Sequence, residues 1–163
     1  MSHAIQTRLD GRPGRYFSWA ELTTTGTGLI NEPPPEHRTN LQILVQVVLD
    51  PLRDYLGRPV RVTSGYRSPA VNVAIGGSRT SAHMTGEAAD LKVDGLDAHA
   101  LVAALRACHP AGGWDQIIAY APERGGHCHV GICAGAWSRH RQQVLWAPAS
   151  GGYEPYPRRA PTP

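Results

Sequence analysis

Lysine is almost absent from this sequence of 163 residues, and no cluster of basic residues stands out. Lysine occurs only at Lys92, and the formal net charge at pH 7 is +3. A surface that binds nucleic acid needs a dense group of basic side chains to meet the phosphates. We therefore expect no nucleic-acid partner. A mildly basic surface would suit an anionic polymer such as cell wall, but it does not point to one.

Cysteine is also scarce, and long apolar runs are missing. The three cysteines, Cys108, Cys128 and Cys133, cannot all pair within one chain, which argues against a secreted disulfide scaffold. A Cys128–Cys133 bridge is conceivable, but we expect reduced, partly buried thiols. No segment could cross a membrane, and no apolar stretch of signal-peptide length begins the chain. We expect synthesis in the cytoplasm without a signal peptide, and no membrane insertion.

The sequence does contain both helical and strand-like periodicity. Ser18 and Glu21 form a capping-box pattern that marks a first short helix, and further helices are predicted at 40–56, 70–74 and 97–108. Strands are predicted at 58–63, 88–93, 116–120 and 129–132. The last two strands are separated by a short connection, which indicates a hairpin. The expected fold class is α+β, with a small, mostly antiparallel sheet and flanking helices.

The length of the chain favours one domain, which we expect over residues 16–147. Residues 1–15 are polar and rich in Gly and Arg, so they are expected to be a loose N-terminal arm. Residues 148–163 are rich in Pro, Gly and Arg, so they are expected to be an irregular, partly disordered tail. The expected oligomeric state is a monomer.

Two separate stretches contain candidate metal ligands. In the first, SAHMTGEAADLKV, His83 and Asp90 stand seven positions apart. The second is His127-Cys128-His129, at the start of the second hairpin strand. Side chains alternate along a strand, so the two histidines of this stretch face one side and the cysteine faces the other.

Imidazole nitrogens and a carboxylate oxygen suit zinc better than magnesium or calcium. A catalytic zinc takes three protein ligands, which would leave one of these histidines for proton transfer. Taken singly, however, a His–Asp pair in a turn is more often a hydrogen bond, and two alternate histidines are as often surface residues as ligands. The remaining histidines are expected to be solvated: His3, His37, His99, His109 and His140.

Several motifs occur in an order that resembles a known family. They are Ser64-Gly65-Tyr66-Arg67-Ser68-Pro69, then Asn72, Gly76-Gly77, Ser81-x-His83-x-x-Gly86-x-Ala88-x-Asp90, and His127-x-His129. This order resembles the zinc D-Ala-D-Ala carboxypeptidase family of peptidoglycan peptidases, over residues 60–132. That family shares its fold with the hedgehog signalling domain, so a hedgehog/D-Ala-D-Ala peptidase-like fold is implied.

The resemblance also implies roles for particular residues. His83, Asp90 and His129 resemble the three zinc ligands, so Zn²⁺ is the expected cofactor. Arg67 resembles an arginine that binds the substrate carboxylate or the tetrahedral intermediate; the alternative is an ion pair that pins its loop. Asp115 would either orient a zinc-bound histidine or cap the hairpin.

One position departs from the family pattern. Many members carry an acidic general base three positions before the last zinc histidine, where this chain has Gly126. Glu123 could reach the site only if its loop folded over it. His127 is the better candidate for proton transfer, because a histidine titrates near neutrality.

The function implied is that of a zinc metallopeptidase, a hydrolase of peptidoglycan stem peptides. It would cleave D-Ala-D-Ala or another D-residue-containing bond, as a carboxypeptidase or an endopeptidase. Lacking a signal peptide, it would reach the cell wall after release, as an endolysin-like phage lysis enzyme or a virion component. The alternative is a non-enzymatic, zinc-containing recognition module or a virion structural module of the same fold.

Overall fold

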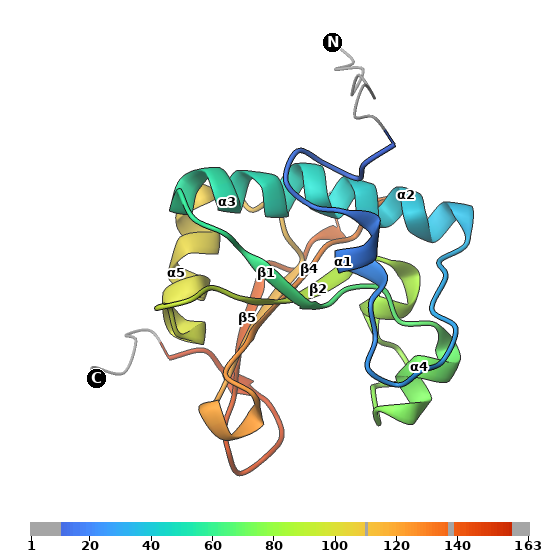
Figure 1. The fold of residues 1–163 in the computed structure, drawn as a ribbon. Helices are drawn as coiled ribbons and strands as arrows, with labels where there is room; N and C mark the ends of the chain where they lie inside the picture. Colours follow the sequence, from blue (N-terminus) through green and yellow to red (C-terminus); the bar gives the residue numbers. More distant parts are fainter. Residues whose placement is uncertain (1–10, 110, 137–138, 158–163) are drawn as a thin grey trace.

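The computed structural model describes residues 11–109, 111–136 and 139–157, and within them it contains one six-stranded sheet (Figure 1). The strand order is β1-β2-β4-β3-β5-β6, and every neighbouring pair is antiparallel except β3 and β5. The strands are β1 (Arg61–Ser64), β2 (Ala88–Lys92), β3 (Gln116–Tyr120), β4 (Cys128–Gly131), β5 (Gln143–Ala147) and β6 (Glu154–Pro155). The expected α+β fold with a mostly antiparallel sheet is confirmed.

Helices cover one face of the sheet and build the core with it (Figure 1). The α-helices are α1 (Trp19–Thr23), α2 (Pro35–Leu44), α3 (Asp50–Leu56), α4 (Pro69–Ala74) and α5 (Ala98–Cys108). Short turns of other helix types are η1 (Val45–Leu49, a π-helix), η2 (Ala82–Thr85) and η3 (Pro122–Arg124). Leu91 and Val130 of the sheet share the core with Leu44 of α2 and Leu105 of α5. The opposite face carries Asp90 and His129 together with apolar side chains such as Ile118.

The long helix begins earlier than the sequence pattern predicts. The pattern placed its start at Asn40, whereas α2 begins at Pro35 and continues through η1 into α3. Proline suits the first helical turn because the N–H that it lacks has no partner there. A second proline, Pro51, lies two residues after the end of the π turn η1. Its ring would clash with a carbonyl in a regular α-helix, which gives a reason for the wider turn.

Described residues on both sides of the expected domain pack against it. Pro13 and Gly14 are buried, and the backbone N–H of Arg15 donates to the buried carboxylate of Asp50 at 2.8 Å. At the other end, Glu154–Pro155 forms β6 inside the segment that was expected to be irregular. Residues 1–10 and 158–163 of the two expected tails lie outside the described residues.

The helices and the cysteines bear on the expectations about membrane insertion and disulfide bonds. Within the described ranges, none of the helices combines the length and the apolarity needed to cross a bilayer. The three cysteines are free thiols, and Cys128 is fully buried in the core. Burial raises the pKa of the Cys108 thiol to about 11, so that thiol stays protonated near neutral pH.

Candidate metal centre

Two of the candidate ligands are positioned by the register of the sheet. Asp90 on β2 lies directly opposite His129 on β4, so both side chains leave the same, open face. Their neighbours Leu91 and Cys128 also face each other, and both point into the core. His83 approaches the same point from η2, and all three candidate ligands are buried. The structure therefore brings together the three residues that the motifs singled out.

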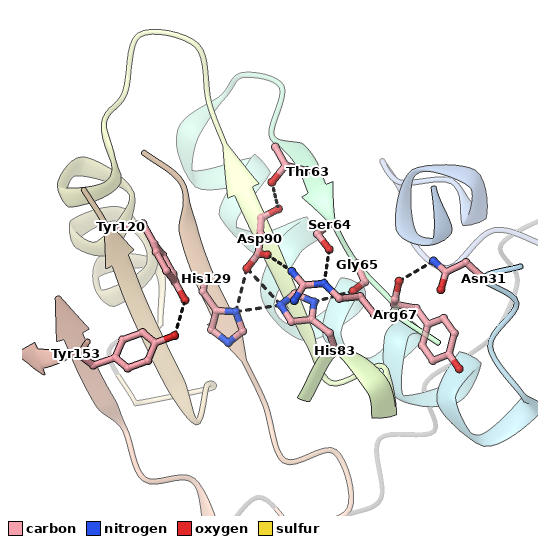
Figure 2. A network of polar contacts seen from close by, with 11 residues as sticks. Asn31, Thr63, Ser64, Gly65, Arg67, His83, Asp90, Tyr120, His129 and Tyr153 are labelled. Carbon is pink, nitrogen blue, oxygen red and sulfur yellow. Dashed lines mark hydrogen bonds and ion pairs between the residues drawn. The ribbon is translucent and has the colours of Figure 1, made fainter. Parts of the chain in front are cut away.

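The three facing atoms form a nearly equilateral triangle (Figure 2). His83 Nε2 is 3.2 Å from His129 Nδ1 and 3.3 Å from Asp90 Oδ1, and His129 Nδ1 is 3.0 Å from that oxygen. A tetrahedral zinc with bonds of about 2.0–2.1 Å holds its ligand atoms about 3.3–3.4 Å apart. The triangle has the size of one face of such a tetrahedron, so these residues could hold a metal ion.

The loop after β1 sets the tautomer of His83. Its Nδ1 lies 2.7 Å from the backbone oxygen of Gly65, and because a carbonyl can only accept, Nδ1 must carry the proton. Nε2 then keeps its lone pair for a metal. A second bond, from Arg67 N to His83 O at 3.1 Å, ties the same two segments together. The unprotonated Nε2 of His83 is therefore available as a ligand atom.

Asp90 uses its two oxygens in different directions. Oδ1 faces the histidines, whereas Oδ2 accepts from Arg67 Nη2 at 2.5 Å. Arg67 is held in turn by donation from its Nε to Ser64 Oγ at 2.8 Å. Burial would raise the pKa of Asp90, but the neighbouring imidazoles outweigh it and hold this pKa well below its usual value. Burial lowers the pKa of His83, which favours its neutral, ligating form.

Glycine allows the turn that carries His83 to pack closely. Gly86 ends η2 with a positive φ of 72°, and a Cβ there would lie 2.3 Å from the backbone oxygen of His37 in α2. Asn40, which the pattern proposed as a helix cap, instead donates from α2 to the backbone oxygen of Thr85 at 2.9 Å. The three candidate ligands His83, Asp90 and His129 (the triad) are thereby held against the long helix as well as against the sheet.

The triad opens into a cleft of about 560 Å³. Three arginines, Arg67, Arg124 and Arg141, line it, and among the described lining residues the sole carboxylate is Asp90. Further lining residues include Gln116, Ile118 and Tyr120 on β3, Leu145 on β5, Ser78 to Ala82 except Arg79, and Tyr153. The cleft is therefore cationic, and it would become more so with a bound metal.

His127 lines this cleft together with the triad. Its ring stacks on Tyr120, with centroids 4.2 Å apart and planes inclined by 18°. Burial lowers the pKa of His127, so its imidazole can accept a proton at neutral pH. Glu123, in η3, is exposed and is not among the described lining residues, and Gly126 has no side chain to offer.

The side chain of Asp115 is held by Arg141, which lines the cleft. Its carboxylate accepts from three N–H groups of Arg141: the backbone N at 2.7 Å, Nε at 3.1 Å and 3.0 Å to the two oxygens, and Nη2 at 2.5 Å. Burial would raise the pKa of Asp115, but these bonds lower it overall. Asp115 therefore connects β3 to the segment that leads into β5.

Sequence reasoning did not identify four cleft residues: Tyr120, Arg124, Arg141 and Tyr153. The alternation of β3 could have found Tyr120, because it lies two residues beyond Ile118 on the same face. For Tyr153 there was no signal, since it belongs to a Gly- and Pro-rich segment.

Several histidines expected to be solvated are partly buried and have contacts. His99 stacks on Trp146 with centroids 4.6 Å apart and lies 2.7 Å from the Tyr156 hydroxyl. His140 accepts from the backbone N of Cys133, His109 contacts the backbone oxygen of Val48, and His37 packs near Tyr66. The prediction of solvation was wrong for these four, and His3 lies outside the described residues.

Comparison with known proteins finds one protein family whose model matches the chain. The model of the family described as Peptidase M15 matches residues 15–130, which is well over half of the chain. The matched range includes Arg67, the three candidate ligands and His127, and it ends before β5 and β6. No curated protein matches the chain significantly.

Proposed function

Since the chain belongs to the peptidase M15 family, we propose that it is a zinc-dependent peptidase of peptidoglycan stem peptides. The bond attacked would contain a D-residue, with D-Ala-D-Ala as the first candidate. The observation that carries the proposal is the buried triangle of His83, Asp90 and His129 beside a cleft. The choice of substrate is supported by the motif resemblance across residues 60–132.

The donor set supports zinc as the metal. Two imidazole nitrogens and one carboxylate oxygen match the ligands that zinc takes in catalytic sites, whereas magnesium and calcium prefer oxygens. When bound at such a site, zinc lowers the pKa of a water molecule to about 7 and polarises the scissile carbonyl. The protein has to supply the fixed ligands, the proton transfers and the binding of substrate charge.

His127 is the proposed group for proton transfer. It lines the cleft beside the triad and is neutral at neutral pH, so it can take a proton from the attacking water and pass it to the leaving amine. Arg67 is the proposed group for the negative charge of the substrate. Its bonds to Asp90 and Ser64 use two of five N–H donors, which leaves three for a substrate carboxylate or for the developing oxyanion.

The test combines metal content with product analysis. Protein purified without added metal is assayed for zinc and then incubated with synthetic stem peptides and purified cell wall, with and without a chelator. Mass spectrometry identifies the cleaved bond. The proposal requires hydrolysis that stops with the chelator and returns with zinc. Hydrolysis unaffected by removal of the metal would contradict it.

A non-enzymatic zinc-containing recognition module is the second candidate. It is favoured by one observation: the sole carboxylate among the described lining residues, Asp90, is itself a candidate ligand, so no carboxylate base is at hand there. Zinc-loaded protein that binds stem peptides but leaves all of them intact would favour this candidate. A protein that neither holds zinc nor cleaves peptides would favour a purely structural role.

A further inference from the structure

The segment around β6 folds back to one end of the cleft. It brings Tyr153 beside Tyr120 of β3, with the two hydroxyl oxygens 3.2 Å apart (Figure 2). Arg124 of η3 joins them: its Nη1 donates to the backbone oxygen of Gly152 at 2.8 Å, and its guanidinium lies 5.2 Å and 5.5 Å from the two ring centroids. Tyr153 lies beyond residue 130, outside the range that the family comparison covers.

These three side chains present hydrogen-bond donors to the cleft. A guanidinium has five N–H donors and no acceptor, so Arg124 keeps several after its bond to Gly152. Two hydroxyls in contact can share one proton between them, which leaves the other O–H free to donate. Burial raises the pKa of Tyr120 far above its usual value, so this phenol keeps its proton at neutral pH.

Arg124 also differs from the other two cleft arginines in its partners. Arg67 is paired with Asp90, and Arg141 is paired with Asp115. No acidic side chain of the described residues forms an ion pair with Arg124, whose partners are a neutral carbonyl and two aromatic rings. The exposed position of Tyr153, at 56% of its surface, leaves the group open to a ligand. An anionic ligand would supply the counter-charge.

The strand geometry places this group relative to the triad. Ile118 of β3 lies opposite His129, and Tyr120 is two residues farther along the same face. At about 3.3–3.4 Å per strand residue, Tyr120 is roughly 7 Å beyond the row that carries the triad. For a peptide that lies extended along β3, which advances by a similar step, a group bound there belongs to a residue about two positions from the bond beside the triad.

We propose that Tyr120, Arg124 and Tyr153 form a subsite for a substrate carboxylate about two residues from the scissile bond. The proposal rests on the proposed peptidase function and adds to it a determinant of substrate choice. Tyr120 and Arg124 lie inside the matched family range, whereas Tyr153 lies outside it, so this chain's own C-terminal segment contributes part of the preference for an anionic substrate.

The first test compares two synthetic stem peptides that differ only at this position, one with a free carboxylate and the other with a carboxamide. Wild type is expected to show a kcat/KM at least about tenfold higher for the carboxylate, as one charge-assisted hydrogen bond provides. Arg124→Gln should abolish the preference by lowering only the carboxylate value. Tyr153→Phe keeps the ring but removes the hydroxyl, so it should lose part of the preference for the carboxylate peptide.

The matched control is Arg106→Gln, which removes the same charge from an exposed position of α5 outside the cleft lining. It should keep the full preference. Equal kcat/KM values for the two peptides in wild type would overturn the proposal, as would an unchanged preference in both Arg124→Gln and Tyr153→Phe.

A second test does not require turnover. The full-length chain is titrated with glutarate and with glutaramide, and NMR follows the Arg124 Nε–H and the Tyr153 ring signals. Glutarate alone should shift both signals, and Arg124→Gln should remove the Tyr153 shift. Shifts confined to Arg67 and the triad would overturn the subsite. If no stem peptide is cleaved, the proposed function fails, and this titration still decides the subsite.

Discussion

Arg67 donates to Asp90 Oδ2 at 2.5 Å while the other oxygen of that carboxylate faces His83 and His129. The arginine of the SGYRS segment therefore anchors the back of a candidate metal ligand. Both side chains are largely buried, so solvent screens their attraction little. An arginine that could bind substrate thus also sets the direction in which the ligand oxygen points.

Removing this arginine should weaken metal binding. Groups that orient a metal ligand typically contribute about 10–100-fold in affinity, so Arg67→Gln is expected to lower zinc affinity by that factor. Competition with a chromophoric chelator measures it, with Arg106→Gln as the charge-matched control. Unchanged zinc affinity combined with a raised KM would assign Arg67 to the substrate alone.

Removing a ligand should abolish the stabilisation that zinc provides. With zinc at 100 times its Kd, wild type should gain about 2.7 kcal/mol of stability, and Asp90→Asn or His83→Ala should gain almost none. Thermal unfolding with and without zinc measures the gain. Asp94→Asn makes the same chemical change at an exposed position and should behave as wild type. A full zinc response in Asp90→Asn would refute the triad.

Replacing the proposed proton-transfer group should separate binding from turnover. His127→Ala should keep one zinc and lose about 10²–10⁴-fold in kcat. Cys128→Ala is a neighbouring control, because that side chain faces the core and its loss should leave kcat of the folded protein unchanged. If His127→Ala releases zinc and His129→Ala retains it, the roles of the two histidines are exchanged.

Two glycines allow the packing of the His83 turn to be measured. Gly76 and Gly86 both have positive φ, but a Cβ at Gly76 would meet nothing within 4 Å, whereas at Gly86 it would lie 2.3 Å from the His37 carbonyl oxygen. Gly76→Ala should cost about 1–2 kcal/mol from backbone strain alone. Gly86→Ala should cost about 3 kcal/mol or more, because backbone must also move. Urea unfolding measures both costs, and similar values would contradict the close approach.

The pair formed by Asp115 and Arg141 should make stability depend on pH. The folded-state pKa of Asp115 is lowered, so its contribution is present above the unfolded pKa of about 3.9 and is lost as the pH falls. At pH 7 the unfolding free energy of metal-free wild type should exceed that of Asp115→Asn by about 1 kcal/mol, and the difference should shrink as the pH falls below about 3.9. Urea unfolding at pH 7, 5 and 3 follows this trend. A loss of zinc affinity in Asp115→Asn would instead support its orienting a histidine.

The parts of the structure that follow from local pattern could be predicted from the sequence. Strict alternation placed His129 and Cys128 on opposite faces of β4, and the motif spacing led to the triad. The local sequence pattern does not show which distant segments pair with each other. The parallel pairing of β5 with β3, the partner of Asp115 and the contacts of His99 all join segments more than 20 residues apart. The short β6 was hidden by a Gly- and Pro-rich composition that is typical of disorder.

The register of β2 against β4 has a consequence for how the protein matures. A slip of one residue would turn either Asp90 or His129 toward the helices, because side chains alternate between faces. A misaligned chain would then have at most two of the three candidate ligands at the site. Zinc would bind tightly only to molecules with the native register and would stabilise them over misaligned ones. The ion would therefore favour correct folding before any substrate binds.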